Sequence, residues 1–488
     1  MSDYKWNLLL ITTIGTFMGS LDGSIVNIAI PTISMDLKAP FELIQWVTIV
    51  YLLVMAISLV ALGRLGDLHG RKNFFLLGLA TFTISSFLCA TAITPIMLVS
   101  FRAIQGFGSS LISSSTPAMV TETFSPQERG RAMGINVASI YLGLTIGPVL
   151  GGILTQFSTW RSIFYINLPI GAIAFIAGLR FLKPSTKAEK KQAFDIPGMI
   201  MFALFLAPLL LALTLGNWVG WGDISILIYV VIAVVGLACF IIVESKAATP
   251  MINLSLFRHN RMFAAGNITA LLNYIGINGV LFLMSIYLQS FLQFPVIIAG
   301  MLMLPAPLTQ SLVSLKSGKL SDRIGSRALC AAGMGIIGLG IFMIIVVVNL
   351  LSPVFLLVSL FIMGAGTGLF SSPNQSAIMG SVEKRDLGIA AGVLSTMRTT
   401  GQSISVALLS AIVGMFIAPA ILNTAIAVGG PINVTPEIVA QFQFGMSIAY
   451  LASICLCMLG VITALLRGSH SQTQEIHETP SEISAPDA

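Results

Sequence analysis

Asp22 and Arg102 are the residues of this 488-residue chain whose types and positions most clearly suggest chemistry, because both fall inside long apolar runs. A charged side chain among apolar residues is costly and therefore a candidate functional group. At 1.5 Å per helical residue, Asp22 lies about 6 Å beyond the middle of its run, and Arg102 lies about 9 Å from the end of its own. We expect the two side chains to interact, directly or through water. Such a carboxylate can exchange its ionic contact for a proton when solvent access changes.

Polar residues follow Arg102 at spacings of three and four, which places them on one face of a helix. Two further apolar runs, at 261–288 and 388–417, carry polar stripes of the same kind. We expect the three faces to line a central cavity, whereas the plain alternative is hydrogen bonding between neighbouring helices. The predicted cavity residues are Gln105, Ser109, Ser113, Asn267, Tyr274, Asn278, Arg398 and Gln402.

The first apolar run has two polar faces that a straight helix cannot turn toward one cavity. Asp22 lies on one of them. Either Gly23 permits a local break in the helix, or Asp22 faces an adjacent helix. The opposite face carries small polar side chains, namely Thr13, Thr16, Ser20, Ser24 and Asn27.

Small residues recur every four positions in the run at 132–155. Gly143, Gly147 and Gly151 form a flat face that lets a neighbouring helix approach closely. Pro148 removes one helical hydrogen bond and favours a kink, and Gly152 follows the stripe directly. From the residues alone we expect close packing at an interface that can flex.

Composition identifies the elements that must position these residues. The chain is 56% hydrophobic and only 9% charged, with a mean hydropathy of +0.94, whereas a soluble globular protein is about 25% charged. So few charges cannot cover a water-facing surface, which excludes a soluble multidomain protein, a disordered chain and a nucleic-acid-binding protein. A polytopic all-α membrane protein remains, because backbone polar groups in lipid must be satisfied within helices.

Fourteen apolar runs are long enough to cross a bilayer core about 30 Å thick. We therefore predict fourteen transmembrane helices. Their ranges are 6–30, 43–63, 74–94, 96–120, 132–155, 163–182, 197–215, 224–243, 261–288, 294–315, 329–349, 353–373, 388–417 and 441–466.

Basic residues set the direction of these spans. Of the 25 Lys and Arg residues, 21 lie in loops or at span ends on one side, and only Lys38 and Arg161 lie on the other. Because cytoplasmic loops are enriched in Lys and Arg, we predict that both termini are cytoplasmic. The first span lacks a small-residue cleavage site, so we do not expect a cleaved signal peptide. Glu122, at the cytoplasmic end of the fourth span, is a second candidate for proton coupling.

Two cytoplasmic loops are similar in sequence. Residues 63–72 read GRLGDLHGRK and residues 318–327 read GKLSDRIGSR, with Gly, Leu, Asp and Gly at matching positions. The copies are eight spans apart, which indicates two six-span halves with two spans inserted between them. The alternative is chance similarity of two glycine-rich basic loops. The predicted division is a cytoplasmic N-terminus at 1–5, six-helix bundles at 6–182 and 261–467, a linker with two inserted transmembrane helices at 183–260, and a disordered cytoplasmic tail at 468–488.

These loops are predicted to act as a cytoplasmic latch that holds the two halves together while the cavity faces out. The glycines permit a tight turn, and an Asp can accept from helix N-terminal N–H groups or pair with an Arg. The alternative is a plain turn with topogenic charges. The latch residues are Gly63, Asp67, Gly70, Arg71 and Asp322.

The remaining residues suggest neither a metal site nor an enzyme. The five cysteines all fall inside apolar runs and no pair has metal-ligand spacing. Two of the four histidines lie in the polar tail. No span contains a nucleophile, a base and an acid close to one another. We predict no metal, no cofactor and no enzymatic activity.

Several of these segments resemble signatures of the major facilitator superfamily. GRLGDLHGRK resembles its signature loop, RAIQGFG at 102–108 its arginine motif, and GLTIGPVLGG at 143–152 the motif associated with antiporters. LDGSIVNIAIP at 21–31 and WRSIFYINLP at 160–169 resemble the fourteen-span drug:proton antiporter subfamily. The resemblance covers essentially residues 6–467. Leu68 departs from it, because the family often has a basic residue at that position.

The resemblance implies a multi-pass transporter of a prokaryotic cytoplasmic membrane that exports drug-like or amphipathic small molecules in exchange for protons by alternating access. In this scheme a proton from outside neutralises Asp22 and weakens its hold on Arg102, and substrate then displaces the proton inward. A proton-coupled uptake symporter and an exporter of one specific metabolite are the alternatives. We expect a monomer in the lipid bilayer, with a small-molecule substrate and protons as partners and no nucleic acid.

Overall fold

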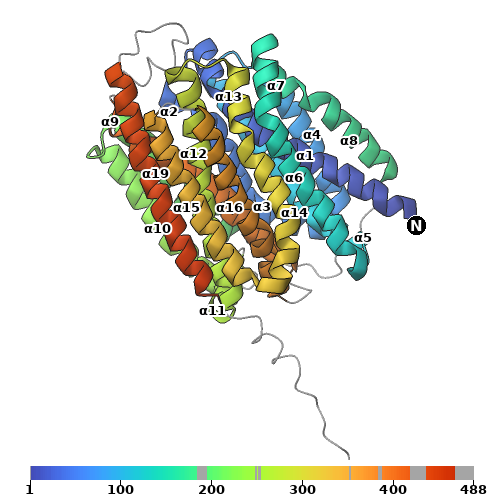
Figure 1. The fold of residues 1–488 in the computed structure, drawn as a ribbon. Helices are drawn as coiled ribbons and strands as arrows, with labels where there is room; N and C mark the ends of the chain where they lie inside the picture. The colour runs from blue at the N-terminus through green and yellow to red at the C-terminus, as the bar shows by residue number, and fades with distance from the viewer. Residues whose placement is uncertain are drawn as a thin grey trace, which may run out of the picture.

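The computed structural model of the chain describes residues 2–183, 195–247, 250, 254–350, 353–382, 387–417 and 436–467. Within these residues all regular secondary structure is helical, and the long helices run side by side (Figure 1). Short helices are α2 (Phe41–Ile44), α7 (Ser162–Tyr165) and α11 (Leu254–His259). The longer ones are α1 (Ser2–Leu37), α3 (Trp46–His69), α4 (Arg71–Ala90), α5 (Pro95–Thr123), α6 (Pro126–Phe157), α8 (Asn167–Phe181), α9 (Ile196–Val219), α10 (Ile224–Lys246), α12 (Arg261–Ile286), α13 (Val296–Met303), α14 (Pro305–Ile324), α15 (Ser326–Leu350), α16 (Pro353–Gly380), α17 (Leu387–Gly414) and α19 (Pro436–Leu465).

Twelve candidate spans, judged by length and apolar character, are present in the described ranges, and they match twelve of the fourteen predicted ones. The other two predictions coincide with α3 and α17. Trp46–Leu59 of α3 is an apolar segment, and the side chains that directly follow it lie outside the described residues, whereas α17, although 28 residues long, is not among the twelve. α17 carries many hydroxyl side chains, and those of Thr396 and Ser403 are completely buried. Its polarity therefore faces other helices, which lowers its hydropathy without exposing those groups to lipid.

Several predicted boundaries are wrong. α1 continues through Pro31 to Leu37 and is much longer than the predicted run. The predicted span at 294–315 corresponds to one candidate span, Val296–Gly318, which consists of two helices, because α13 ends at Met303 and α14 begins with Pro305. A proline fits the first turn of a helix but disfavours helical conformation in the residue before it. The predicted span at 261–288 continues into a π-helical turn at Tyr287–Phe291.

Close packing around α5 is repeated around α16. A Cβ added to Gly106 of α5 would collide with the backbone of α3, and one on Gly108 would lie 2.7 Å from a backbone nitrogen of α4. Gly364 and Gly366 of α16 have the same relation to α14 and α15, and the Cβ on Gly366 would again lie 2.7 Å from a backbone nitrogen. Two glycines with one residue between them thus let one helix pack closely against two neighbours in both parts of the chain.

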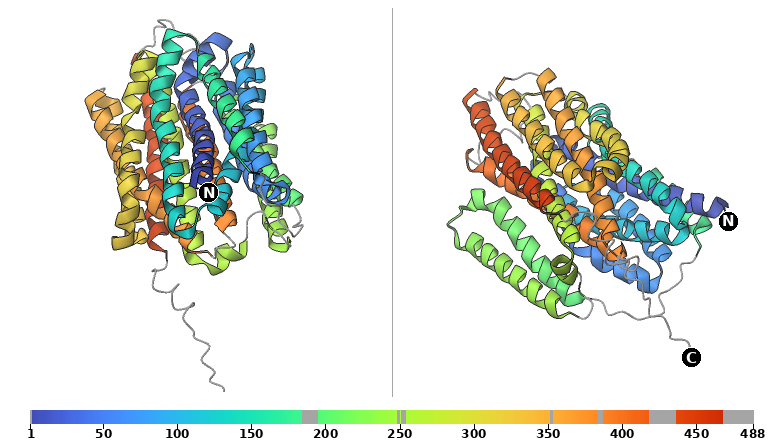
Figure 2. Two further views of the ribbon diagram at one scale, coloured as in Figure 1. Left: turned by 90° about the vertical axis from the view of Figure 1, so that its right-hand side faces the viewer. Right: turned by 60° about the horizontal axis from the view of Figure 1, so that its bottom comes forward.

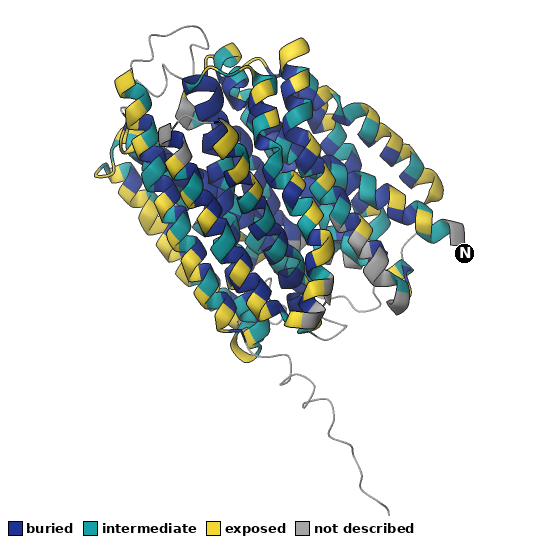
Figure 3. Cartoon of the chain, in the orientation of Figure 1, coloured by how far each residue is buried: buried dark blue, intermediate teal, exposed yellow. Residues whose placement is uncertain are grey.

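α9 and α10 pair with each other at one edge of the molecule, where Figure 2 shows them in green. Large apolar side chains of α10 face outward: Val234 is 63% exposed and Val235 is 54% exposed. Figure 3 shows such exposed positions along the outer faces of the helices, with buried positions between them. This distribution is typical of helices that contact lipid.

Candidate functional site

A cavity of about 300 Å³ lies between two sets of helices. One set is α1, α3, α5 and α6, and the other is α12, α14, α16 and α17, joined by Met303 at the end of α13. Arg102 lies on its wall. The predicted cavity residues that also lie there are Ser109, Ser113, Tyr274, Asn278, Arg398 and Gln402.

Gln105 and Asn267 were also predicted to line the cavity, and this is wrong: both are completely buried away from the wall. The amide of Gln105 bonds to Asp22 and Arg102. The amide of Asn267 donates to the Phe263 carbonyl of its own helix at 2.9 Å. A polar stripe on a helix is wide enough to face both a cavity and a neighbouring helix. The spacing of the residues alone does not show which of them a given side chain faces.

The polar face of α1 lines the cavity, and Asp22 faces an adjacent helix. Gly19, Ser20, Ser24 and Asn27 belong to the wall, whereas Asp22 does not. α1 is unbroken from Ser2 to Leu37, so no local break turns the carboxylate inward. Of the two predicted arrangements, the structure has the second.

α16 contributes a wall that the sequence reasoning missed. Thr367, Ser371 and Gln375 line the cavity at spacings of four residues, and Asn374 lies beside them. The signal was present as TGLFSSPNQS, which carries a polar residue on one face of every turn. This polar pattern was missed because it lies within a predominantly apolar run.

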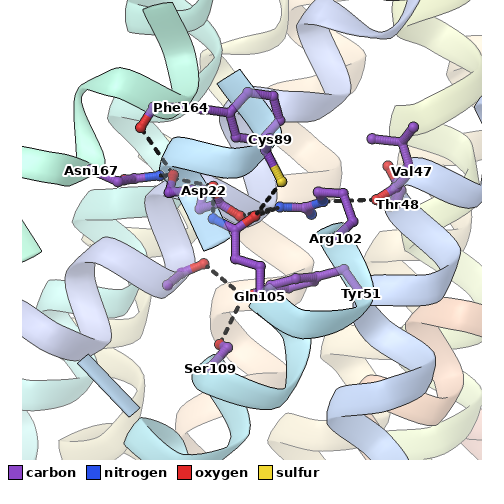
Figure 4. A network of polar contacts seen from close by, with 12 residues as sticks. Asp22, Val47, Thr48, Tyr51, Cys89, Arg102, Gln105, Ser109, Phe164 and Asn167 are labelled. Atoms are coloured by element: carbon purple, nitrogen blue, oxygen red, sulfur yellow. Dashed lines mark hydrogen bonds and ion pairs between the residues drawn. The ribbon is translucent and has the colours of Figure 1, made fainter. Parts of the chain in front are cut away.

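Asp22 is completely buried and accepts hydrogen bonds from three side chains (Figure 4). Its Oδ2 lies 2.5 Å from Nη1 of Arg102. Its Oδ1 accepts from Nε2 of Gln105 at 3.1 Å and from Nδ2 of Asn167 at 3.0 Å. Arg102 and Gln105 come from α5 and Asn167 comes from α8, so one carboxylate connects three helices. The predicted contact between the carboxylate and the guanidinium is confirmed, and it is direct.

The Arg102 guanidinium is held on several sides. Its Nε donates to the Val47 carbonyl at 2.9 Å, and Nη1 also donates to Oε1 of Gln105 at 2.8 Å. The Tyr51 ring lies under the guanidinium, 4.2 Å from ring centroid to Cζ, and the Tyr51 hydroxyl donates to Ser109 at 2.8 Å. Because Arg102 is part of the cavity wall, it is the residue that contacts both the buried carboxylate and the cavity.

Asn167 is a member of this network that the sequence reasoning missed. Its Nδ2 also donates to Ser86 at 3.0 Å, and the Ser86 hydroxyl donates to the Phe164 carbonyl at 2.9 Å. A chain of hydrogen bonds therefore connects Asp22 to α4 and to α7. The only signal was the position of Asn167 within WRSIFYINLP, which did not indicate the partner.

The glycine-rich segment of α6 has two separate faces. Gly143, Gly147 and Gly151 pack against α1, as their spacing predicts: a Cβ on Gly143 would lie 2.8 Å from a backbone oxygen of α1. Pro148 and Gly152 face α13 instead. A Cβ on Gly152 would lie 2.8 Å from Cα of Ile297, and the Pro148 carbonyl is in contact with a glycine of α13. The segment therefore joins α6 to the first set of helices on one face and to the second set on the other.

Hydrogen bonds between the two sets occur at this same end of the molecule. Ser285 of α12 donates to the Asn27 carbonyl at 2.9 Å, and Gln289 donates to the Ile28 carbonyl at 2.9 Å. A third bond joins the start of α13 to a glutamine side chain near the end of α6. The cavity is therefore closed at the end where α1 and α12 terminate.

The predicted latch loop at 63–72 is almost entirely helical, so its description as a loop is wrong. Gly63 lies inside α3, which runs to His69, and only Gly70 separates α3 from α4. Gly70 has a φ of 104°, a conformation that favours glycine. The second copy has the same design, with Gly325 at a φ of 89° between α14 and α15.

Side-chain contacts test only part of the predicted latch. Arg71 donates to the Ala118 carbonyl at 3.1 Å and lies 3.2 Å from the Glu122 carboxylate. Glu122, the second candidate for proton coupling, therefore forms an ion pair at the end of α5. The side chains of Asp67 and Asp322 lie outside the described residues.

Arg467, predicted only as a basic span end, is buried with an exposure of 1%. It follows α19 and donates to Sγ of Cys330 at 3.1 Å and to Oδ1 of Asn374. Burial lowers the pKa of its guanidinium, while Cys330 opposes that change. Asn374 is on the cavity wall, so this buried arginine contacts a cavity residue from behind.

No group of three or more His, Cys, Asp or Glu side chains within the described residues could hold a metal ion. Arg102 and Arg398 are charged residues of the cavity wall, and Asp22 pairs with Arg102.

The chain is similar to one known protein family and to several named proteins. Residues 12–406 match the model of the family described as "Major Facilitator Superfamily". The chain is 36% identical over 414 residues to the riboflavin transporter RibZ of Clostridioides difficile, covering 83% of this chain and 88% of that protein. It is 32% identical over 410 residues to the multidrug resistance protein Stp of Mycobacterium tuberculosis, covering 84% of this chain and 76% of that protein.

A third relative is the methylenomycin A resistance protein of Bacillus subtilis, 32% identical over 415 residues and covering 83% of this chain and 87% of that protein. Among solved structures, the partially occluded inward open xylose transporter XylE from E. coli is similar with a TM-score of 0.60. That match covers 94% of this chain and 98% of the other at 14% sequence identity, so it supports the fold alone.

Proposed function

This chain belongs to the Major Facilitator Superfamily and is a multi-pass membrane transporter, and we propose that it exports drug-like or amphipathic small molecules across the cytoplasmic membrane in exchange for protons. Relatives named for drug or antibiotic resistance support export, and the motif at 143–152 supports antiport. The fourteen-span drug:proton antiporter subfamily, with both termini cytoplasmic and a monomeric chain, is part of the proposal.

The observation that carries the proposal is the buried ion pair between Asp22 and Arg102. A carboxylate taken out of water is stable only while its charge is compensated. When solvent access changes, a proton can replace the arginine as the compensating partner. Protonation would then remove the charge that holds Arg102 and weaken the acceptor shared by Gln105 and Asn167. One proton would thereby loosen contacts among α1, α5 and α8.

Coupling to substrate is proposed to pass through Arg102. Asp22 is absent from the cavity wall, so a bound molecule cannot displace a proton from it by direct contact. Arg102 contacts both the carboxylate and the cavity. A substrate that changes the position of Arg102 would change the proton affinity of Asp22, and the reverse holds by linkage.

Alternating access then requires the closed end to open. In the proposed orientation this end faces outward, so the state described here is closed to the outside. We propose that the helices of 6–182 and of 261–467 move as two bundles, with the helices of 183–260 inserted between them and the tail at 468–488 apart. Outward opening would separate Gly152 from Ile297 and break the bonds from Ser285 and Gln289.

The proton gradient supplies enough free energy for this exchange. One charge crossing 100 mV yields about 2.3 kcal/mol, and one pH unit adds about 1.4 kcal/mol. Because a tenfold concentration ratio costs about 1.4 kcal/mol, one or two protons can drive a gradient of 100-fold or more.

A second candidate function is transport of one specific metabolite. The relative named as a riboflavin transporter is 36% identical over most of both chains, which favours this alternative. A proton-coupled uptake symporter would use the same ion pair with the opposite relation between fluxes. The direction of proton movement when substrate is added distinguishes it from an antiporter.

Asp22→Asn tests the proposal. We expect this variant to insert into the membrane normally but to lose substrate-driven proton movement, measured with a pH-sensitive dye in inverted vesicles. Asp36→Asn is the matched control, because Asp36 lies on the same helix and pairs with Arg161 at 2.7 Å, far along the helix from Asp22. Full substrate-driven proton movement in Asp22→Asn vesicles would contradict the assignment.

A further inference from the structure

The two arginines of the cavity wall differ in what surrounds them. Arg102 is compensated by Asp22 at 2.5 Å. Arg398, on α17, is half-buried on the wall. Across the described ranges, its guanidinium makes neither a hydrogen bond nor an ion pair. A partly buried guanidinium without a counter-charge leaves up to five donors unused, so the cavity keeps one positive charge available.

No acidic side chain shares the cavity wall with these arginines among the residues that the structure describes. The remaining wall is apolar or neutral and polar. The negative charge of Asp22 compensates Arg102 on the side of α1 and α5. Arg398 belongs to α17, in the opposite set of helices. The cavity wall is therefore electrostatically positive on the side of Arg398.

The surroundings of Arg398 suit the rest of an organic ligand. Gln402 lies one turn along α17 and also faces the cavity. Tyr274 faces the same space from α12, which approaches α17 so closely that a Cβ on Gly401 would lie 2.9 Å from Cβ of Tyr274. Ile277 and Phe370 supply apolar surface. A charged donor, neutral polar groups and apolar walls together fit a molecule with one anionic group on an apolar or aromatic body.

We propose that the transported molecule is an organic anion, such as an aromatic carboxylate, whose anionic group pairs with Arg398. This inference rests on the proposed transport function and names the substrate class of the same cavity. Carboxylate and guanidinium form charge-assisted and often bidentate hydrogen bonds, which give Arg398 the partner that the protein does not supply. A cationic molecule would meet a positive wall without a counter-charge and is disfavoured.

The assignment also keeps the Asp22–Arg102 pair available to the proton. The anion is held by Arg398 of α17, and because the cavity wall also includes Arg102 of α5, a bound anion attracts Arg102 and thereby changes the proton affinity of Asp22. Exchange of an anion leaving the cell for a proton entering it moves positive charge inward in both half-reactions. A membrane potential that is negative inside therefore favours each of them.

The test compares three fluorescent ligands that share one ring system and differ in charge: anthracene-9-carboxylate, its neutral carboxamide and the cationic 9-(aminomethyl)anthracene. Binding to the purified full-length chain in lipid nanodiscs is followed by fluorescence anisotropy without any proton gradient. We expect the carboxylate to bind at least about tenfold more tightly than the other two, as for a hydrogen bond to a charged group. Arg398→Gln should abolish that preference, and Arg398→Lys should retain part of it.

Arg180→Gln is the matched control, because it removes an arginine from the exposed end of α8, away from the cavity. It should leave all three affinities unchanged. The proposal is overturned if the unmodified chain binds none of the three ligands, if the cation binds as tightly as the carboxylate, or if the preference survives in Arg398→Gln. Where Arg398→Gln fails to fold, the order of affinities in the unmodified chain still decides. Failure of proton antiport would appear only in the vesicle assay with Asp22→Asn, so the two results remain distinguishable.

Discussion

A Cβ placed on Gly152 of α6 would lie 2.8 Å from Cα of Ile297 in α13, so these two helices are in backbone contact. Real side chains do not approach a backbone atom so closely, and closure at this end therefore depends on a residue without a side chain at position 152. The contact joins the two sets of helices directly above the cavity, beside the bonds from Ser285 and Gln289.

Gly152→Val is expected to keep this end open. Overpacking a close contact costs about 1–3 kcal/mol, which is enough to shift a balanced equilibrium between two states by roughly 5- to 150-fold. The measurement is labelling of Ser24→Cys on the cavity wall by a membrane-impermeant thiol reagent added from outside. Gly335→Val is the control, because a Cβ at Gly335 meets no atom within 4 Å. Equal labelling of both variants would show that the Gly152 contact does not control access.

Tyr51 supports Arg102 in two ways that substitution can separate. Tyr51→Phe removes the bond to Ser109 but keeps the ring beneath the guanidinium, whereas Tyr51→Leu removes both. A buried cation–π contact contributes about 2 kcal/mol and a neutral hydrogen bond about 1 kcal/mol. We expect the transport rate to fall several-fold in Tyr51→Phe and at least tenfold in Tyr51→Leu, measured as initial efflux in vesicles. A larger loss in Tyr51→Phe than in Tyr51→Leu would reverse this assignment.

Arg467 is expected to act on Asn374 rather than on stability. Arginine can only donate, so its bond occupies the amide oxygen of Asn374 and leaves the amide nitrogen of this cavity-wall residue as a donor for other partners. Arg467→Met removes a buried guanidinium that has no acidic partner among the described residues, and this gain offsets the loss of its bonds to Cys330 and Asn374. Arg467→Met should therefore retain the melting temperature but change the relative affinities for ligands that differ only in a hydrogen-bond acceptor. A melting temperature lowered by 10 °C or more, with unchanged relative affinities, would indicate a purely structural role.

The sequence predicted the contact between Asp22 and Arg102 because helical rise converts residue number into depth, and two opposite charges at one depth attract. It did not predict that Gln105 and Asn167 complete the network. A polar stripe gives a direction around one helix but not the identity of the neighbouring helix. Whether a side chain faces a cavity or another helix depends on tertiary packing. In the case of Gln105, the packing directs the side chain toward Asp22 and not toward the cavity.

Glycines show the same limit in the fold. The spacing of Gly143, Gly147 and Gly151 predicted close helix packing, and the contact with α1 confirms it. The repeated pairs, Gly106 with Gly108 in α5 and Gly364 with Gly366 in α16, were not predicted to pack closely, because two glycines with one residue between them form no stripe. The latch segment at 63–72 was predicted to be a loop with a tight turn at its glycines. A helix tolerates Gly63, however, and α3 ends only at Gly70, whose positive φ favours glycine.

α9 is hydrogen-bonded to both sets of helices near the closed end. Trp46 of α3 donates to Thr214 at 3.3 Å, and Asn217 donates to the Ala411 carbonyl of α17. If the two sets separate during transport, α9 must release one of these contacts. Gly414 packs against the Asn217 side chain, whereas the hydrogen bond from Trp46 to α9 is long and part-buried. α9 is therefore expected to stay with α17 and leave α3.

Cross-linking in a cysteine-free background tests which contact breaks. A short bismaleimide joining Asn217→Cys to Ala411→Cys should leave efflux intact, because both positions move together. The same reagent joining Trp46→Cys to Thr214→Cys should arrest efflux, because it ties α9 to the set that departs. Thr16→Cys with Ser139→Cys, whose native hydroxyls lie 3.3 Å apart within one set, is the control that should tolerate the link. If the link between Asn217→Cys and Ala411→Cys arrests efflux and the link between Trp46→Cys and Thr214→Cys does not, α9 moves with α3. If efflux continues with all three links, the outer ends of the two sets do not separate along this edge.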